Sequence, residues 1–193
     1  MVTADGGRQT ADGRRQTADG GRQTAALASG VRRSEVAPME LFSASFAHGG
    51  AIPVRHTCDG ANTSPPLSWS GVPSGTKSLT LIVDDPDAPD PEAPKRIWVH
   101  WVLFNIAPAV TSLAEGGARS PVPSGAREGL NDGDELGYDG PCPPIGRHRY
   151  FHTLYALDAV LPELGPKARR RNLDEAMKGH ILATAQIMGT YQR

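Results

Sequence analysis

The sequence predicts a mainly β protein with one helix close to the C-terminus. Glycine and proline supply 22 + 17 = 39 of the 193 residues, which is typical of a chain with many turns and short strands rather than of a helical bundle. Three runs between residues 40 and 160 carry strand patterns. A helical spacing of apolar residues appears only after residue 172.

Residues 1–38 differ in composition from the rest of the chain. They contain three tandem heptads, TADGGRQ (3–9), TADGRRQ (10–16) and TADGGRQ (17–23), in which alanine is the only apolar residue. Because these heptads offer no apolar seam to bury, they predict a disordered tail rather than a coiled coil, with a nucleic-acid-binding arm as the weaker alternative. We expect a folded domain over residues 39–193 and regard Met39 as a candidate translation start.

Three segments are predicted to be strands. Residues 78–85 (SLTLIVDD) form an apolar run between turn signals, and residues 96–106 (RIWVHWVLFNI) are rich in aromatic and β-branched side chains. Residues 148–159 (HRYFHTLYALDA) form the third strand. Loops rich in glycine, serine and proline are expected over residues 107–147.

Strict alternation assigns the side chains of the second and third strands to faces. In the second strand, one face would carry Trp98, His100, Val102 and Phe104, and the other Val99, Trp101 and Leu103. In the third strand, one face would carry His148, Tyr150, His152 and Leu154, and the other Phe151, Thr153, Tyr155 and Leu157.

The segment LDEAMKGHILATAQIM (173–188) is predicted to form an amphipathic helix that packs on the sheet. Asn172 and Glu175 fit a capping pair at its start. The apolar residues with helical spacing are Leu173, Met177, Ile181, Ala185 and Met188.

Composition argues against several classes of function. The formal net charge of −1 provides no field that would attract nucleic acid or an acidic membrane, and no apolar stretch is long enough to span a bilayer. The N-terminus lacks the apolar core of a signal peptide, so the sequence predicts a cytoplasmic protein. In that compartment Cys58 and Cys142 are expected to be free thiols, although both lie in segments that should approach the same region.

Polar and aromatic side chains gather where the predicted strands begin or end. They are Asp85 and Asp87 in VDDPDAPDPEAP (83–94), Trp98 and His100 in the second strand, and His148 and Tyr150 in the third. If these strands are neighbours, the side chains converge at one end of a sheet. The ordinary alternative is that the histidines are core residues and that the Asp-Pro pairs are turns.

Two long motifs resemble the phosphatidylethanolamine-binding protein family, also called Raf kinase inhibitor protein-like, and its bacterial branch in particular. The first is DPDAP (85–89) followed by VHWVLFNI (99–106), and the second is GPCPPIGRHRYFHTLYALD (140–158). The resemblance covers about residues 40–193. It implies a large antiparallel sheet packed on a smaller one, helices near the C-terminus, and a cavity at the end of the sheet that binds small anions, including the phosphate groups of phospholipid heads.

By motif position, the resemblance implies a set of ligand-binding residues. They are Asp85, Trp98, His100, Gly140, Cys142, His148 and Tyr150. A carboxylate beside His100 or His148 would raise the pKa of the imidazole and supply a charged donor. Tyr150 would donate its hydroxyl group, and a phosphate that keeps a proton would share it with Asp85. Of the nearby carboxylates, Asp87 is expected to bind loop backbone, whereas Asp84 and Asp90 are expected to be solvated.

The sequence therefore favours a non-enzymatic protein that binds a small anionic or phosphorylated ligand, without cofactor, metal, nucleic acid or integral membrane contact. A kinase or other signalling partner is unproven, and the protein is expected to be a monomer or homodimer. The first alternative is a hydrolase that uses His100 or His148 as general base, with Asp85 as the orienting acid. A weaker alternative is a metal site built from Asp85, His100 and His148.

Overall fold

The computed structural model of the chain describes residues 37–116 and 122–193. The predicted tail of residues 1–38 falls almost entirely outside these ranges and stays a prediction. The elements in chain order are β1 (Glu40–Ser43), the 3-10 helix η1 (Val54–His56), β2 (Leu67–Ser70), β3 (Ser78–Asp85), β4 (Trp98–Ile106), β5 (Ser112–Leu113), β6 (Arg127–Gly129), β7 (His148–Leu157), α1 (Arg170–Met177) and β8 (Ile181–Tyr191).

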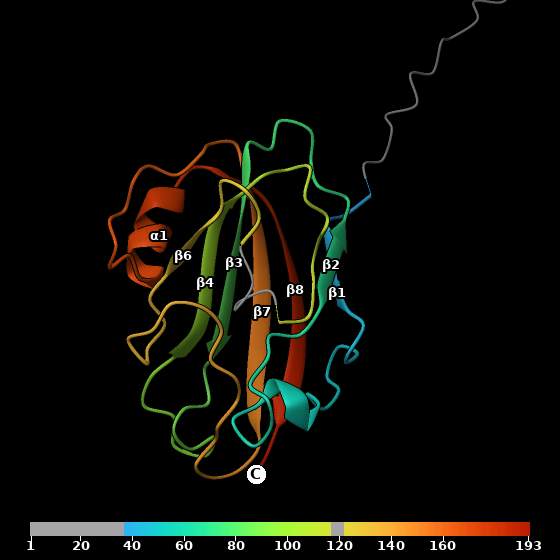
Figure 1. Cartoon of the computed structure of the whole chain (residues 1–193), viewed down its shortest axis with the longest axis vertical. Helices are drawn as coiled ribbons and strands as arrows, with labels where there is room; N and C mark the ends of the chain where they lie inside the picture. The colour runs from blue at the N-terminus through green and yellow to red at the C-terminus, as the bar shows by residue number, and fades with distance from the viewer. Residues whose placement is uncertain (1–36, 117–121) are drawn as a thin grey trace, which may run out of the picture. The chain divides into compact units, whose positions relative to one another are not determined.

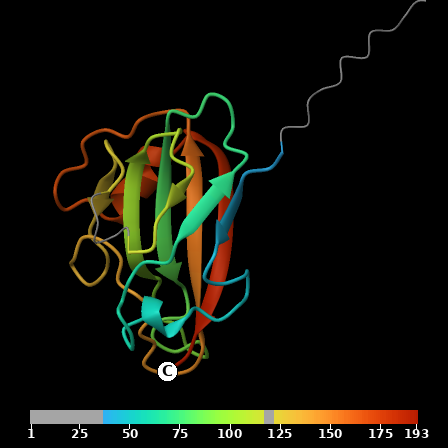
Figure 2. The ribbon, with the colours of Figure 1, turned by 45° about the vertical axis from the view of Figure 1, so that its right-hand side comes forward.

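Two antiparallel sheets form the fold. The large sheet has the strand order β6-β4-β3-β7-β8 and the small sheet the order β1-β2-β5. Apolar residues of the small sheet, among them Leu41 and Trp69, form one buried cluster with Leu81 and Leu154 of the large sheet. Figures 1 and 2 show β1 and β2 beside the large sheet. The predicted fold class, a large antiparallel sheet on a smaller one, is confirmed.

The opposite face of the large sheet is covered by α1. Leu173 and Met177 of this helix are buried in a second cluster with Ile82 of β3 and with Val102 and Phe104 of β4. Among the described residues, no helix is both long and apolar enough to cross a membrane. The two buried clusters lie on opposite faces of the large sheet. The strand β3 at its centre is therefore buried along almost its whole length.

The predicted strands are present, but the strict alternation predicted for β4 is wrong. The register between β3 and β4 shifts between Val83 and Asp84, which is a β-bulge or similar irregularity. As a result Val99 packs with Val102 in the cluster that α1 covers, whereas Trp101 packs in the cluster between the two sheets. His100 likewise lies on the side of Tyr150, with ring centroids 5.2 Å apart, and not with Val102.

The predicted loop region and the predicted long helix also need correction. Residues 107–147 contain the short strands β5 and β6. The helix stops at Met177, and its N-terminal box uses Asn172 from inside the first turn, where Oδ1 accepts the Arg169 backbone N–H at 3.0 Å. Gly179 follows with φ at +79°, a left-handed conformation that glycine adopts without steric cost.

The segment predicted as the second half of the helix is strand β8. It pairs with β7 from His148↔Tyr191 to Leu157↔Ile181. The apolar residues of ILATAQIM fit a strand period of two as well as a helical spacing of four. In the structure Ala185 and Ile187, which are two positions apart, are both buried. The long ladder with β7 decides between the two patterns, and this information is not local to the segment.

His152 generates a prediction about stability. It is buried against Phe46, with ring centroids 5.5 Å apart, and burial lowers the pKa of His152 to about 3. The unfolded chain takes up a proton near pH 6.5 whereas the folded protein does not, so the free energy of unfolding falls as the pH drops from about 6.5 toward 3. Replacing His152 with leucine should reduce this slope by up to about 1.4 kcal/mol per pH unit.

Urea unfolding of His152→Leu between pH 7 and pH 5 checks this expectation. The matched control is His48→Gln, because His48 is exposed and the substitution should keep the wild-type slope. A His152→Leu protein with an unchanged slope would contradict it.

Candidate functional site

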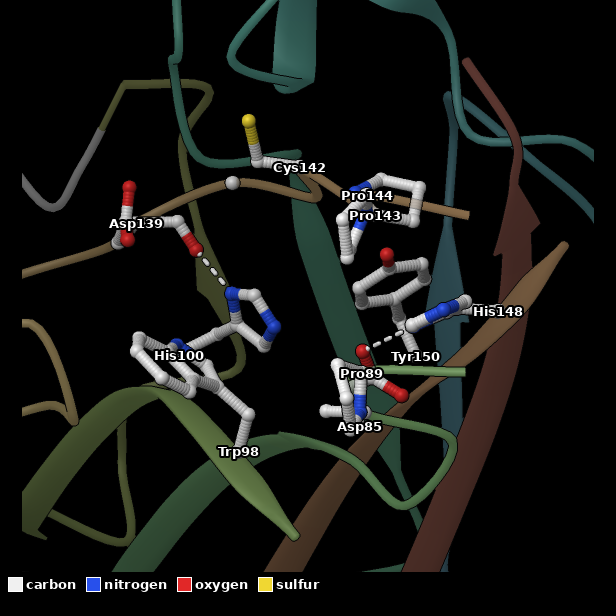
Figure 3. Close-up of a pocket in the computed structure, with 12 residues that line it drawn as sticks. Asp85, Pro89, Trp98, His100, Asp139, Cys142, Pro143, Pro144, His148 and Tyr150 are labelled. Carbon is white, nitrogen blue, oxygen red and sulfur yellow. Dashed lines mark hydrogen bonds and ion pairs between the residues drawn. The ribbon is translucent and has the colours of Figure 1, made fainter. Parts of the chain in front are cut away.

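Three neighbouring strands bring the predicted site residues to one end of the large sheet. β3 lies between β4 and β7 and is antiparallel to both, so the end of β3 meets the starts of the other two strands. Asp85 is the last residue of β3, Trp98 is the first of β4 and pairs with Asp85, and His148 is the first of β7. Figure 3 shows these side chains around one space.

Asp85 and His148 form a buried ion pair. The Nδ1 atom of His148 lies 2.7 Å from Asp85 Oδ2, and its Nε2 atom lies 3.0 Å from the carbonyl oxygen of Ile145. Asp85 Oδ1 accepts the backbone N–H of Asp87 at 2.7 Å. A carbonyl oxygen and an ionised carboxylate can only accept hydrogen bonds. Both ring nitrogens of His148 therefore carry protons and donate, one to Asp85 and one to Ile145.

This geometry changes the role expected for His148. Both N–H groups of its ring are directed at protein atoms rather than into the cavity. His148 therefore neutralises Asp85 and supports the cavity wall. It also presents no nitrogen lone pair to a metal ion, which argues against the metal site proposed from Asp85, His100 and His148.

His100 is held in the opposite state. Its Nδ1 atom donates to the carbonyl oxygen of Asp139 at 2.6 Å, and its buried Nε2 atom has no hydrogen-bond partner among the residues that the structure describes. Burial lowers the pKa of His100 despite the carbonyl and the nearby carboxylates of Asp85 and Asp139. The expectation that a carboxylate would keep this imidazole charged is therefore wrong, because desolvation is the larger effect.

Tyr150 supplies a second unpartnered atom. Its ring stacks on His148 and meets the edge of His100, and within residues 37–116 and 122–193 its buried hydroxyl oxygen has no hydrogen-bond partner. Burial, assisted by the charge of Asp85, raises the pKa of Tyr150 well above its usual value. The hydroxyl therefore keeps its proton and can donate one hydrogen bond into the cavity.

The other carboxylates of the 83–94 segment lie outside the cavity lining. Asp87 Oδ2 accepts both the backbone N–H and Nε of Arg149 at 2.9 Å, and these bonds lower the pKa of Asp87. Asp87 therefore bonds to the backbone of strand β7 and not to loop backbone as predicted. Asp84 is not solvated as predicted, because its side chain is only 13% exposed and forms an ion pair with Arg170. The charge of the segment thus serves mainly to fix the strand ends.

One wall of the cavity is fastened to the segment after η1. The Gly140 N–H donates to Asn62 Oδ1 at 2.7 Å, and a Cβ atom on Gly140 would lie 2.3 Å from the carbonyl oxygen of His56, so only glycine fits. Tyr138 donates its hydroxyl to the same His56 carbonyl at 2.9 Å.

A disulfide between Cys58 and Cys142 completes this attachment and corrects the prediction of free thiols. Their Cα atoms are 5.4 Å apart, although 84 positions separate them in the chain. The prediction was derived from the cytoplasmic default, in which disulfides are rare. The cytoplasmic location itself stays a prediction.

The resulting cavity has a volume of about 200 Å³. All seven residues predicted to bind ligand line it: Asp85, Trp98, His100, Gly140, Cys142, His148 and Tyr150. The sequence reasoning missed Ala88, Pro89, Asp139 and Pro144, which also line it. Asp139 accepts the His100 bond with its backbone carbonyl, which any residue could supply. Asn62 lies outside the cavity lining and far from Gly140 in the sequence, so no local pattern marks its contact.

Comparison with known proteins extends over nearly the whole described domain. The sequence profile described as "Phosphatidylethanolamine-binding protein" matches residues 42–192. A UPF0098 protein of Methanothermobacter thermautotrophicus is 52% identical over 156 residues, which are 80% of this chain and 99% of the relative.

Two solved structures are similar as well. A phosphatidylethanolamine-binding protein homolog of Chlamydia trachomatis has a TM-score of 0.73 and 46% identity, covering 81% of this chain and 98% of its own. E. coli YbcL, described as a member of the mammalian PEBP family, has a TM-score of 0.74 and 33% identity, covering 81% and 99%.

The disulfide yields a prediction that can be checked chemically. Iodoacetamide should modify neither cysteine of the unreduced protein and both after denaturation and reduction. Substitution of both Cys58 and Cys142 by serine should lower the free energy of unfolding by about 2–4 kcal/mol, because the cross-link closes a long loop in the unfolded chain. Two modified cysteines before reduction would contradict the pairing.

Proposed function

Because this chain belongs to the phosphatidylethanolamine-binding protein family, we propose that it binds, without turnover, a small ligand that carries a phosphate or similar anionic group. The ligand would occupy the cavity between β3, β4 and β7. A phospholipid headgroup and a free phosphate monoester share this chemistry. Modulation of a signalling partner by the ligand-loaded protein is the finer part of this proposal.

The observation that carries the proposal is the pair of unpartnered polar atoms in the cavity, His100 Nε2 and the Tyr150 hydroxyl. Buried polar atoms in folded proteins are normally hydrogen-bonded, and each one left unpaired costs about 1–3 kcal/mol. A ligand that hydrogen-bonds to both atoms would recover this free energy. Phosphate oxygens are suitable partners because they accept strongly from a hydroxyl donor.

The charge of Asp85 does not oppose an anion as strongly as the sequence suggests. Its carboxylate is neutralised by His148 at 2.7 Å and receives a further N–H donor from Asp87. An anion in the cavity would therefore meet an ion pair rather than an isolated negative charge.

The dimensions of the cavity indicate a small ligand group. Its volume of about 200 Å³ is below the about 300–1,000 Å³ of pockets that enclose drug-sized ligands. Its walls are held by the disulfide and by the bonds around Gly140, so little ordering would accompany binding. A headgroup fits this space better than a complete lipid with its acyl chains.

The alternative function is a hydrolase. The unprotonated Nε2 atom of His100 favours it, since a neutral imidazole directed into a cavity can act as a general base. His148 cannot take that role while both of its nitrogens donate to protein oxygens. Among the described residues, those that line the cavity include no serine, threonine or lysine that could act as a nucleophile, and we therefore favour binding over catalysis.

Isothermal titration with inorganic phosphate, phosphoserine and glycerophosphoethanolamine tests the proposal. Tyr150→Phe should weaken binding by about tenfold or more, because it removes a hydrogen bond to a charged group worth about 1.5–3 kcal/mol. The control is Tyr155→Phe, the same substitution on the opposite face of β7 and outside the cavity lining. It should leave the affinity unchanged.

Two results would count against this function. If no phosphate compound binds, the cavity is not the proposed anion site. If the ligand is recovered hydrolysed, and His100→Phe abolishes the hydrolysis, the protein is an enzyme and the alternative is correct.

A further inference from the structure

The two unpartnered atoms of the cavity are not equivalent. Because the carbonyl oxygen of Asp139 can only accept, the 2.6 Å bond places a proton on Nδ1 of His100. In the neutral ring Nε2 then carries a lone pair and can only accept. Tyr150 keeps its hydroxyl proton and can donate. The cavity therefore offers one acceptor and one donor, and a matching ligand must offer the reverse.

Several titratable groups surround His100. The titratable groups that act on it or share its cavity are Asp85 from β3, His148, Tyr150 and His152 from β7, and Asp132 and Asp139 from the 130–140 segment. The described part of the chain contributes no lysine or arginine to the cavity lining, and the imidazolium of His148 donates to Asp85 and to Ile145. A doubly charged phosphate would therefore face a lone pair and a carboxylate without an unengaged cation.

From this arrangement we propose that the cavity selects the singly protonated monoanion of a phosphate monoester over the dianion. The P–OH group of the ligand donates to His100 Nε2, and the Tyr150 hydroxyl donates to a phosphoryl oxygen. His100 is thus the residue that sets the protonation state of the ligand. The inference rests on the proposed function and narrows it to monoesters, because the phosphodiester of a phospholipid headgroup has no P–OH group to donate.

The selection has a direct consequence for pH dependence. A phosphate monoester loses its second proton near pH 6. If the bound form is the monoanion, affinity is constant below this pKa and falls about tenfold for each pH unit above it, because the dianion has to recover a proton to bind. Binding at pH 8 should be about 50-fold weaker than at pH 6, because half of the ligand is already dianion at its pKa.

Asp85 is the competing acceptor for the ligand proton. Each of its oxygens already receives one N–H bond, from His148 and from Asp87, whereas His100 Nε2 receives none. The structure therefore assigns the proton to His100. A variant of His100 tests this assignment against Asp85, and a variant of Tyr150 serves as the comparison. Only His100 is expected to govern the pH dependence of binding.

The first experiment measures the affinity of three small probes for the wild-type protein between pH 5 and pH 8.5 by titration calorimetry. Methyl phosphate should bind with the pH profile above. Methylphosphonate, whose second pKa is higher, should show the same profile shifted upward by the difference between the two ligand pKa values. Dimethyl phosphate, a monoanion without an acidic proton, should bind at least about tenfold more weakly than methyl phosphate at pH 5.

The outcomes distinguish failure of the protonation-state selection from failure of the proposed phosphate binding. If none of the probes binds at any pH, the proposed function fails. If methyl phosphate binds equally well at pH 5 and pH 8, or if dimethyl phosphate matches it at pH 5, the function stands and the protonation-state selection is wrong.

The second experiment compares His100→Phe with Tyr150→Phe, using methyl phosphate. Both variants should bind more weakly, but only Tyr150→Phe should keep the tenfold loss per pH unit. A pH profile that survives in His100→Phe would move the proton to Asp85 and overturn the assignment. Independently of any variant, ¹⁵N NMR of the wild-type complex should show His100 protonated at Nδ1 and unprotonated at Nε2. An imidazolium signal would also overturn it.

Discussion

The buried ion pair between Asp85 and His148 is the constraint on which the candidate site depends. It joins the end of β3 to the start of β7 across 63 positions of sequence. Removing either partner of such a pair leaves an uncompensated buried charge, at a cost of about 3–5 kcal/mol. Because His148 also donates to Ile145, the pair is self-contained. Its electrostatic effect is to turn a carboxylate at the end of the central strand into part of a nearly neutral wall, which leaves His100 and Tyr150 to determine what the cavity accepts.

The opposite wall is organised by contacts between distant segments. The disulfide, the Gly140–Asn62 bond and the Tyr138–His56 bond all connect residues 138–142 to residues 56–62. These contacts also position the Asp139 carbonyl that fixes the tautomer of His100. The binding geometry is therefore set before a ligand arrives, which is the condition under which a few hydrogen bonds can discriminate between closely related anions.

The sequence predicted the fold class and the central strands because their signals are local. β3 coincides with the apolar run of residues 78–85, and β4 and β7 contain the aromatic and β-branched segments. The prediction failed where two local patterns were equally good. Residues 181–188 have both helical and strand periodicity, and pairing with β7 over the length of β8 decides for the strand. The register shift between β3 and β4, which falls between Val99 and Trp101 within β4, is likewise a property of two strands together, so alternation within one strand could not place His100 relative to Val102.

For the site, the sequence by itself determined the inventory: an aspartate after one strand, and histidine and aromatic residues at the starts of two others, within motifs that resemble one family. Tertiary structure decided what each group does. It directed both protons of His148 at protein oxygens and paired the cysteines, and it left the Nε2 atom of His100 bare. The physical reason is that protonation and tautomer depend on burial and on which oxygen lies within about 3 Å. Both are set by contacts between segments that lie far apart in the chain.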